Sequence, residues 1–207
     1  MRSIIRGAVV GALFLSAAKV SAQQLGPQRQ FLSIDAFYDR LQLDAGQGQS
    51  RIGIDGYGAR LWINGAPFAG PSSFLGKTAI GLYYSRNPRK DSGIGAAQYG
   101  GELYIYPTER PYGGLIDPFI SLGAGALRIN NRQTASAFGS RLADIKSGNT
   151  TRFAFSPGVG VRVPVFNRIQ LRFDAKDVIV FSRQTRISGD KRTSHSPDFQ
   201  GGLGIEF

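Results

Sequence analysis

Histidine, serine and aspartate, the residue types of a hydrolytic triad, occur together near the end of the chain in His195-Ser196-Pro197-Asp198. A histidine that activates a serine could support acyl transfer. These residues lie where a loop meets a strand, however, and adjacent residues of a strand point to opposite faces. The chain also has no Gly-x-Ser-x-Gly motif. We therefore expect a polar loop end and no enzyme, with an acyl hydrolase or transferase as the catalytic alternative.

A second stretch, Gly70 to Thr78, resembles a phosphate-binding loop but departs from it in two respects. Five residues, not four, separate Gly70 from Gly76, and a strand-like segment follows where the motif needs a helix. Nucleotide binding is therefore not expected. The chain has one histidine and no cysteine, so the sequence offers no metal-binding cluster and no disulfide. It predicts neither a cofactor nor a metal site.

Charged residues also occur on the polar faces of alternating segments, where chemistry of another kind is possible. They are Asp35, Glu102, Arg162, Arg172, Asp174, Lys176 and Glu206. Charges that are buried must be paired and hydrogen-bonded. If these faces line a narrow interior, the sequence predicts a salt-bridged plug, in which removal of one partner costs about 3–5 kcal/mol. The functional alternative is a narrow gated pore.

Eight segments with strand character carry these residues, and connections rich in Gly, Pro, Asn and Ser separate them. They span residues 30–43, 51–64, 76–88, 96–108, 117–130, 152–166, 168–182 and 197–207. Apolar and polar side chains alternate in most of them. In the second segment the phase of alternation changes between Ile54 and Leu61, which predicts a β-bulge near Gly56 or Gly58.

Two chemically different faces recur in these segments, and together they predict a closed barrel. One face combines glycine with charge, which suits the inside of an eight-stranded barrel because only side chains fit there. The other face carries Val, Ile, Leu and Phe, which suit contact with lipid. The predicted fold is all-β, an eight-stranded antiparallel up-and-down transmembrane β-barrel over residues 23–207. We expect aromatic residues at strand ends to anchor the barrel at the membrane interfaces, namely Tyr38, Trp62, Tyr84, Phe119, Phe153, Phe166, Phe181 and Phe207.

The first 22 residues have the pattern of a secretory signal peptide. Arg2 and Arg6 precede a short apolar stretch, and Val20-Ser21-Ala22 places small residues where a signal peptidase cleaves. The apolar stretch is too short to span a membrane well. We therefore expect residues 1–22 to be removed and the protein to leave the cytoplasm. A retained membrane anchor is the alternative.

The leader, the eight segments and three glycine-rich stretches together resemble the small outer-membrane β-barrels of the OmpA/OmpX type. The stretches are Leu122-Gly123-Ala124-Gly125-Ala126, Gly158-Val159-Gly160-Val161-Arg162 and Gly202-Leu203-Gly204-Ile205-Glu206-Phe207. The resemblance implies a place in the outer membrane of a Gram-negative envelope, and insertion by the barrel assembly machinery. In such proteins the machinery recognises a last strand that ends in an aromatic residue. Here that assembly signal would comprise Phe199, Leu203, Ile205 and Phe207.

Basic residues gather in the connections expected on the outer side of the barrel, at about 44–50, 89–95, 131–151 and 183–196. The chain has a formal net charge of +11, and loss of three basic residues with the leader leaves +8. These connections and their margins carry twelve basic and four acidic residues, which accounts for all of that charge. Ordinary solvated loops are one interpretation. The other is contact with lipopolysaccharide phosphates, through Arg89, Lys90, Arg132, Arg141, Lys146, Arg183, Arg186, Lys191 and Arg192.

The sequence thus predicts a non-enzymatic integral outer-membrane protein with a structural or surface-interaction role. We expect it to be a monomer whose partners are outer-membrane lipids and lipopolysaccharide, without nucleic acid. The alternative is a soluble lipocalin-like ligand-binding barrel, which also has eight antiparallel strands but hides its apolar face around a ligand. The face that combines glycine with charge, the terminal Phe207 and the absence of a Gly-x-Trp motif speak against it.

Overall fold

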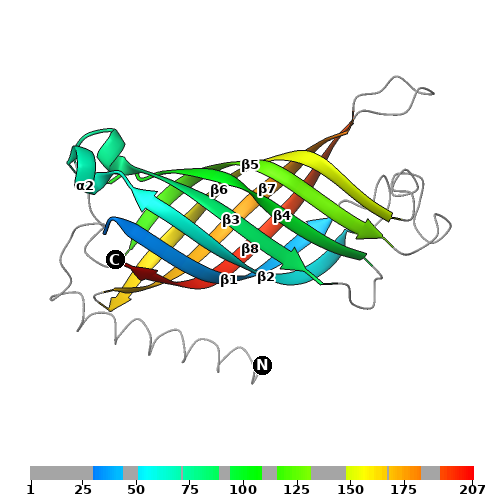
Figure 1. Cartoon of the computed structure of the whole chain (residues 1–207), viewed down its shortest axis with the longest axis horizontal. Helices are drawn as coiled ribbons and strands as arrows, with labels where there is room; N and C mark the ends of the chain where they lie inside the picture. The colour runs from blue at the N-terminus through cyan, green and yellow to red at the C-terminus, as the bar shows by residue number, and fades with distance from the viewer. Residues whose placement is uncertain are drawn as a thin grey trace, which may run out of the picture.

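The protein is a closed barrel of eight antiparallel strands, each hydrogen-bonded to its neighbours in the sequence (Figure 1). The computed structural model describes residues 30–43, 51–70, 72–88, 94–108, 116–131, 148–166, 168–182 and 192–207. The strands are β1 (Leu32–Leu43), β2 (Ile52–Asn64), β3 (Thr78–Asn87), β4 (Ile94–Ile105), β5 (Asp117–Asn131), β6 (Gly148–Phe166), β7 (Ile169–Ser182) and β8 (Arg192–Glu206). Each overlaps the segment predicted for it. The predicted fold class is confirmed.

The barrel closes where the last strand pairs with the first. β8 runs antiparallel to β1 from the pair Ser33 and Glu206 to the pair Leu41 and Asp198. The N–H of Phe207 extends this ladder by donating to the carbonyl of Leu32 at 2.8 Å. The start of β1 and the end of β8 therefore lie at one end of the barrel, on the left in Figure 1. We call this the inner end and the opposite one the outer end.

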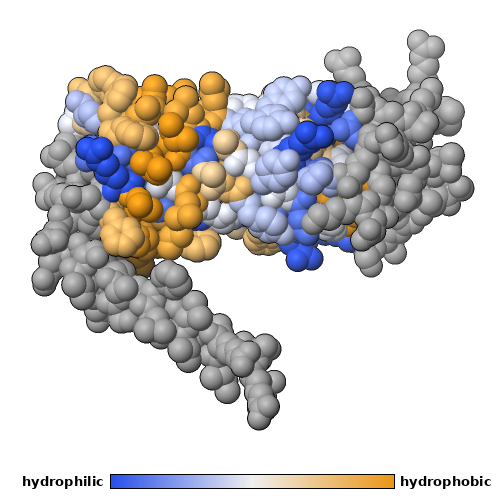
Figure 2. All heavy atoms as spheres, turned by 60° about the horizontal axis from the view of Figure 1, so that its bottom comes forward, coloured by the Kyte–Doolittle hydropathy of each residue, from blue (hydrophilic) through white to orange (hydrophobic). Residues whose placement is uncertain are grey.

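Apolar side chains gather on the half of the barrel nearer the inner end, as the face in Figure 2 shows, and exposed apolar residues on all eight strands make them a continuous band. Alternate residues of each strand face outward there because successive side chains of a strand point to opposite faces. Well-exposed members of the band include Ile34, Leu61, Ile80, Leu82, Ile120, Val159, Phe173 and Leu203. Exposed apolar surface of this extent is found on lipid-facing walls and not on soluble monomers. This band is the membrane-spanning part of the barrel.

Aromatic residues mark both borders of the band. At its outer border Tyr38 pairs directly with Tyr57, and Tyr84 pairs with Tyr99, and all four side chains are 44–61% exposed. We call these four residues the outer girdle. At the inner border Phe31, Phe166 and Phe207 are 44–59% exposed. Aromatic side chains are enriched at the two interfaces between the hydrocarbon core of a bilayer and water.

Two of the aromatic residues predicted to be interface anchors have a different place. Trp62 and Phe119 are only 0% and 2% exposed, because both stand at lumen-facing positions of their strands. There they pack edge-to-face against Tyr104, with ring centroids 4.7 and 5.5 Å from its centroid. The prediction was wrong for these two because closeness to a strand end does not determine the face.

The predicted bulge in β2 is also wrong. β1 and β2 pair without interruption from Leu32 and Ile63 to Leu43 and Ile52, and Ile54 is buried on the same face as Trp62. Inward and outward side chains alternate along the whole of β2. What changes along the strand is which of the two faces carries the apolar residues. A register shift lies instead between β6 and β7, at Pro164 and Phe166.

Beyond the outer girdle the inside of the barrel is apolar and the outside is polar. Exposed arginines, among them Arg40, Arg86 and Arg128, occupy outward positions at this level. Buried apolar side chains fill the lumen here and form what we call the outer plug, which consists of Leu41, Leu43, Ile54, Ile94, Ala96, Leu127, Ala154, Val178 and Val180. The outer part of the barrel is therefore built like a soluble barrel, with its core inside.

The connection from β2 to β3 carries the only helices in the described part of the chain, α2 (Ala66–Ala69) and the 3-10 turn η1 (Leu75–Lys77). Neither is long and apolar enough to cross a membrane. The stretch that resembles a phosphate loop falls here, and it leads into β3 at Thr78 as expected. Phe68 of α2 packs against Phe31 with ring centroids 5.2 Å apart.

We expect Gly160→Ala to destabilise the barrel. A Cβ at Gly160 would overlap the ring of Phe119 and approach the carbonyl oxygen of Phe173 to 2.6 Å. Overpacking of this kind typically costs about 1–3 kcal/mol. The measurement is urea unfolding of the barrel refolded in lipid vesicles.

The matched control is Gly53→Ala, where the new Cβ would lie 3.6 Å from the side chain of Arg40 in ordinary contact. Its free energy of unfolding should stay within about 0.5 kcal/mol of the wild type. Equal losses in the two variants would contradict the close packing of Phe119 over Gly160.

Candidate functional site

The middle of the lumen holds a layer of buried charge, and it contains the residues that the sequence singled out. Asp35, Glu102, Arg162, Arg172, Asp174 and Lys176 are at most 6% exposed, and Glu206 is partly buried. They come from five different strands, β1, β4, β6, β7 and β8, and three of them stand at successive inward positions of β7. The structure therefore brings the seven residues into one lumen.

Arg60 is the centre of this layer, although the sequence analysis did not include it. Its Nη1 lies 3.2 Å from Asp174 Oδ2 and 4.0 Å from Asp35 Oδ2, and its Nε lies 3.4 Å from Glu102 Oε2. It also donates a hydrogen bond to Gln200. One guanidinium thus links acids from three strands across the lumen. Uninterrupted alternation through β2 would have placed Arg60 inside, but the expected bulge left its face undecided.

Arg172 makes the most regular ion pair of the layer. Its Nε and Nη2 donate to the two carboxylate oxygens of Asp174 at 2.7 and 2.8 Å, which is the bidentate geometry that guanidinium groups favour. Its Nη1 lies 3.6 Å from Asp35 Oδ2. The guanidinium also stacks over three rings at 4.2–4.4 Å from their centroids, those of Trp62, Tyr104 and Phe119. Cation–π contacts of this kind strengthen when water is excluded.

Two further ion pairs extend the layer in both directions. Lys176 donates to Glu102, which also accepts a hydrogen bond from Tyr104. Nearer the inner end, Arg162 pairs with Asp117 and lies 2.8 Å from Glu206 Oε1. Asp117 is another lumen acid that the sequence analysis missed, since it stands at the first residue of β5 where alternation has barely begun.

Toward the outer plug the partners of the lumen acids change from cations to amides. Asn87 Nδ2 donates to Asp39 Oδ1 at 3.1 Å, and Gln200 Nε2 donates to Asp198 Oδ2 at 2.8 Å. Gln98 adds a longer bond of 3.4 Å to Asp198. At the border between charge and apolar packing, amide donors thus bind one oxygen of each carboxylate.

The lumen is therefore filled in three layers. The outer plug is apolar, the middle layer consists of ion pairs, and the inner end holds a cluster of aromatic side chains with Trp62, Tyr104, Tyr106 and Phe119. An ion that crossed the barrel would have to displace buried side chains from every layer. The three layers hold the buried ion pairs in fixed positions and exclude solvent from them.

The triad residue types of the sequence do not form a catalytic unit. His195 is exposed on the outer wall, where its Nδ1 lies 2.6 Å from Asp177 Oδ2. Ser196 and Asp198 face the lumen with 2% and 0% exposure. A histidine and a serine on opposite sides of a barrel wall cannot exchange a proton directly.

The residues predicted to form the assembly signal lie together on the lipid-facing side of β8. Phe199, Leu203, Ile205 and Phe207 are each 48–57% exposed. Their outward stripe borders β1, the strand on which β8 closes the barrel. Recognition of this stripe by an assembly machinery stays a prediction.

The predicted lipopolysaccharide contacts fall almost entirely outside the described residues. Arg192 begins β8, where its backbone pairs with Ser182. The other eight lie beyond the described ranges, namely Arg89, Lys90, Arg132, Arg141, Lys146, Arg183, Arg186 and Lys191. The expected signal peptide, residues 1–22, lies outside them too.

Solved structures of bacterial outer-membrane proteins share this fold. The attachment invasion locus protein Ail of Yersinia pestis matches 87% of this chain over all of its own length, with a TM-score of 0.53 and 11% identity. OprG of Pseudomonas aeruginosa matches 88% of this chain over 98% of its own (TM-score 0.51, 12% identity), and Neisserial surface protein A matches 88% over 99% (TM-score 0.50, 12% identity). No family model matches the chain, and no curated protein is similar to it in sequence.

The fold and its apolar outer band define the class, an eight-stranded transmembrane β-barrel with the fold of these outer-membrane proteins. Within that class the chain has the architecture of the small barrels to which the sequence was compared, those of the OmpA/OmpX type. At 11–12% identity the likeness establishes the fold, and the role of the protein has to be argued from its own residues.

We expect the Lys176 and Glu102 side chains to be energetically coupled. Lys176→Met leaves a buried carboxylate short of one partner, and Glu102→Gln does the same to the ammonium, so each should lower the free energy of unfolding by about 3–5 kcal/mol. The double variant should cost about 0.5–3 kcal/mol less than the sum of the singles. Urea unfolding in lipid vesicles measures all three.

Arg40→Gln serves as the control, because this arginine is exposed on the outer wall and its loss should change stability by no more than about 0.5 kcal/mol. Strict additivity of the two lumen substitutions would show that the pair does not stabilise the barrel.

Proposed function

We propose that the protein is a non-enzymatic outer-membrane barrel with a sealed lumen, which stabilises the membrane and presents basic outer loops to lipopolysaccharide. The observation that carries this proposal is the lumen itself, since buried apolar, charged and aromatic layers follow one another from the outer to the inner end. A barrel built to conduct would keep water along its axis, as large porins do.

The outside of the barrel supports a place in the outer membrane. Its apolar band and two aromatic borders match the hydrocarbon core and its interfaces. A leader with the pattern of a signal peptide supports export, and the lipid-facing stripe of β8 supports insertion by the barrel assembly machinery. The soluble lipocalin-like alternative fails, because in the inner half of the barrel apolar side chains face outward and charges face inward.

The distribution of charge supports contact with lipopolysaccharide. Exposed arginines begin just beyond the outer girdle, with Arg40, Arg86 and Arg128 on the wall. The sequence places further basic residues in the connections that follow these strands at the outer end. Phosphate groups attract guanidinium and ammonium groups at this level of the outer leaflet. A structural or surface-interaction role without catalysis agrees with the separation of His195 from Ser196.

Planar lipid bilayers provide the test of the sealed lumen. We expect no steady conductance from the wild type and none from Glu102→Ala, because removal of one carboxylate leaves the outer plug and the aromatic cluster intact. A reproducible channel in Glu102→Ala alone would show that the charges gate a narrow pore, and a channel in the wild type would show that the lumen is open.

Binding of lipopolysaccharide to the refolded barrel tests the role of the loops. Arg89→Gln combined with Lys90→Gln should weaken binding several-fold, and the wild-type affinity should fall with rising salt because screening weakens exposed charges. The matched control, Lys77→Gln with Arg168→Gln, removes the same charge at the inner end and should leave binding unchanged. Equal effects of the two pairs would show that net charge alone, not its placement, drives binding.

A further inference from the structure

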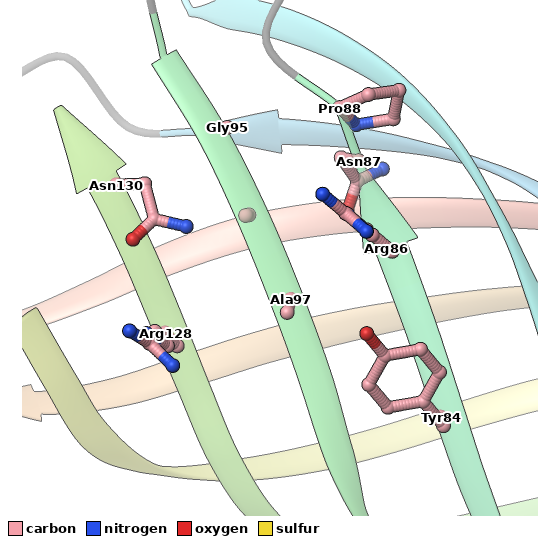
Figure 3. Close-up of a pocket in the computed structure, with 9 residues that line it drawn as sticks. Tyr84, Arg86, Asn87, Pro88, Gly95, Ala97, Arg128 and Asn130 are labelled. Atoms are coloured by element: carbon pink, nitrogen blue, oxygen red, sulfur yellow. The ribbon is translucent and has the colours of Figure 1, made fainter. Parts of the chain in front are cut away.

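A surface cleft on the outer wall lies across β3, β4 and β5, just beyond the outer girdle (Figure 3). It has a volume of about 460 Å³. Side chains from β3 and β5 flank it, and small residues of β4 form its floor. The flanking residues used below are Tyr84, Arg86 and Arg128, and the floor residues are Gly95 and Ala97. None of these residues belongs to the lumen layers.

The register of the three strands places two arginines on either side of an alanine. Arg86 pairs with Ala97, and Ala97 pairs with Arg128, so the three residues form one row across β3, β4 and β5. Two strand spacings separate the arginine backbones by about 10 Å. The methyl group of Ala97 leaves the space between them open, and Figure 3 shows the two side chains on either side of β4.

The height of this row on the wall coincides with the membrane surface. Tyr84 and Tyr99, which pair directly, stand two residues nearer the inner end than Arg86 and Ala97 and belong to the outer girdle. Hydroxyl-bearing rings settle at the interface between hydrocarbon and headgroups. The arginine row therefore lies at the level of the lipid headgroups of the outer leaflet.

Neither arginine of the row is neutralised by the part of the chain that the structure describes. Arg86 and Arg128 are exposed and have no ion pair with an acid among these residues. Arg60, Arg162 and Arg172 differ because each pairs with lumen acids. Elsewhere on the outer wall, the exposed Arg40 pairs across the β1–β2 ladder with Asp55.

We propose that this cleft binds a phosphate monoester of a glycolipid headgroup in the outer leaflet, with Arg86 and Arg128 as a clamp. The planar guanidinium fork donates two parallel hydrogen bonds to phosphate oxygens, and two such groups match the charge of a dianion. Tyr84 lines the edge of the cleft nearer the inner end, where its hydroxyl would be available to the attached sugar. This inference rests on the proposed contact with lipopolysaccharide and adds a defined wall site below the loops.

The test uses the full barrel refolded in detergent and three probes. They are lipid A with both phosphates, the same lipid A after enzymatic removal of its phosphates, and glucose 6-phosphate as a soluble phosphate monoester. Phosphorylated lipid A should bind the wild type most tightly. Loss of charge-assisted hydrogen bonds should make Arg86→Gln and Arg128→Gln each bind it about tenfold more weakly. The double variant should lose most of the wild type's preference for phosphorylated over dephosphorylated lipid A.

Arg40→Gln is the matched control, since it removes one exposed arginine of the same height outside the cleft, and its affinity should stay within about twofold of the wild type. All variants change exposed residues and should therefore fold. Heat-dependent gel mobility verifies folding in each case. Wild-type affinity of the double variant for phosphorylated lipid A would overturn the proposal. Glucose 6-phosphate that binds as tightly as lipid A would overturn the assignment to a lipid and indicate a site for soluble anions.

The same titrations separate this proposal from the proposed function. A wild type that binds no lipopolysaccharide at all defeats both. A wild type whose binding depends on Arg89 and Lys90, but not on Arg86 and Arg128, defeats only the wall site.

Discussion

Closure of the barrel is the constraint from which the other features follow. When β8 pairs with β1, the inward side chains of eight strands share a space that bulk water does not fill. Arg60 and Arg172 can remain charged there only because Asp35, Glu102 and Asp174 surround them. The ion pairs also oppose slippage of the strands, since a shift of β7 by one residue would turn Arg172 and Asp174 toward lipid. We interpret the charged layer as a device that specifies the register as much as it stabilises the fold.

The exchange of polarity at the outer girdle gives the barrel two parts with different solvents. Below the girdle lipid covers the wall, so apolar side chains point outward and charge is held inside. Beyond it water and headgroups surround the wall, so the apolar side chains move inside, and Leu41, Ile54 and Val178 form a core. This core gives the outer part a rigid wall of its own. The cleft across β3, β4 and β5 therefore lies on a rigid part of the wall.

The proposed seal of the lumen would direct any function of the barrel to its surface. Charged groups of the lumen pair with one another, as Glu102 does with Lys176 and Arg162 with Asp117, and none of these four side chains is presented to solvent. On the outer wall the situation is reversed, because Arg86 and Arg128 face outward beside small residues of β4. The same residue type thus stabilises the barrel when it points inward and is available to a ligand when it points outward.

The sequence by itself determined the strands and most of their faces, because alternation with period 2 is a local property of each segment. It also placed Asp35, Arg172 and Glu206 on inward faces without any knowledge of their partners. The tertiary structure alone decided which charges meet, since Arg60 reaches Asp174 across the lumen from a strand 114 residues away. It corrected the bulge in β2 and the interface positions of Trp62 and Phe119, because the polarity of a face depends on its height relative to the bilayer and not on the residues beside it. The row of Arg86, Ala97 and Arg128 likewise exists only through the register of three paired strands.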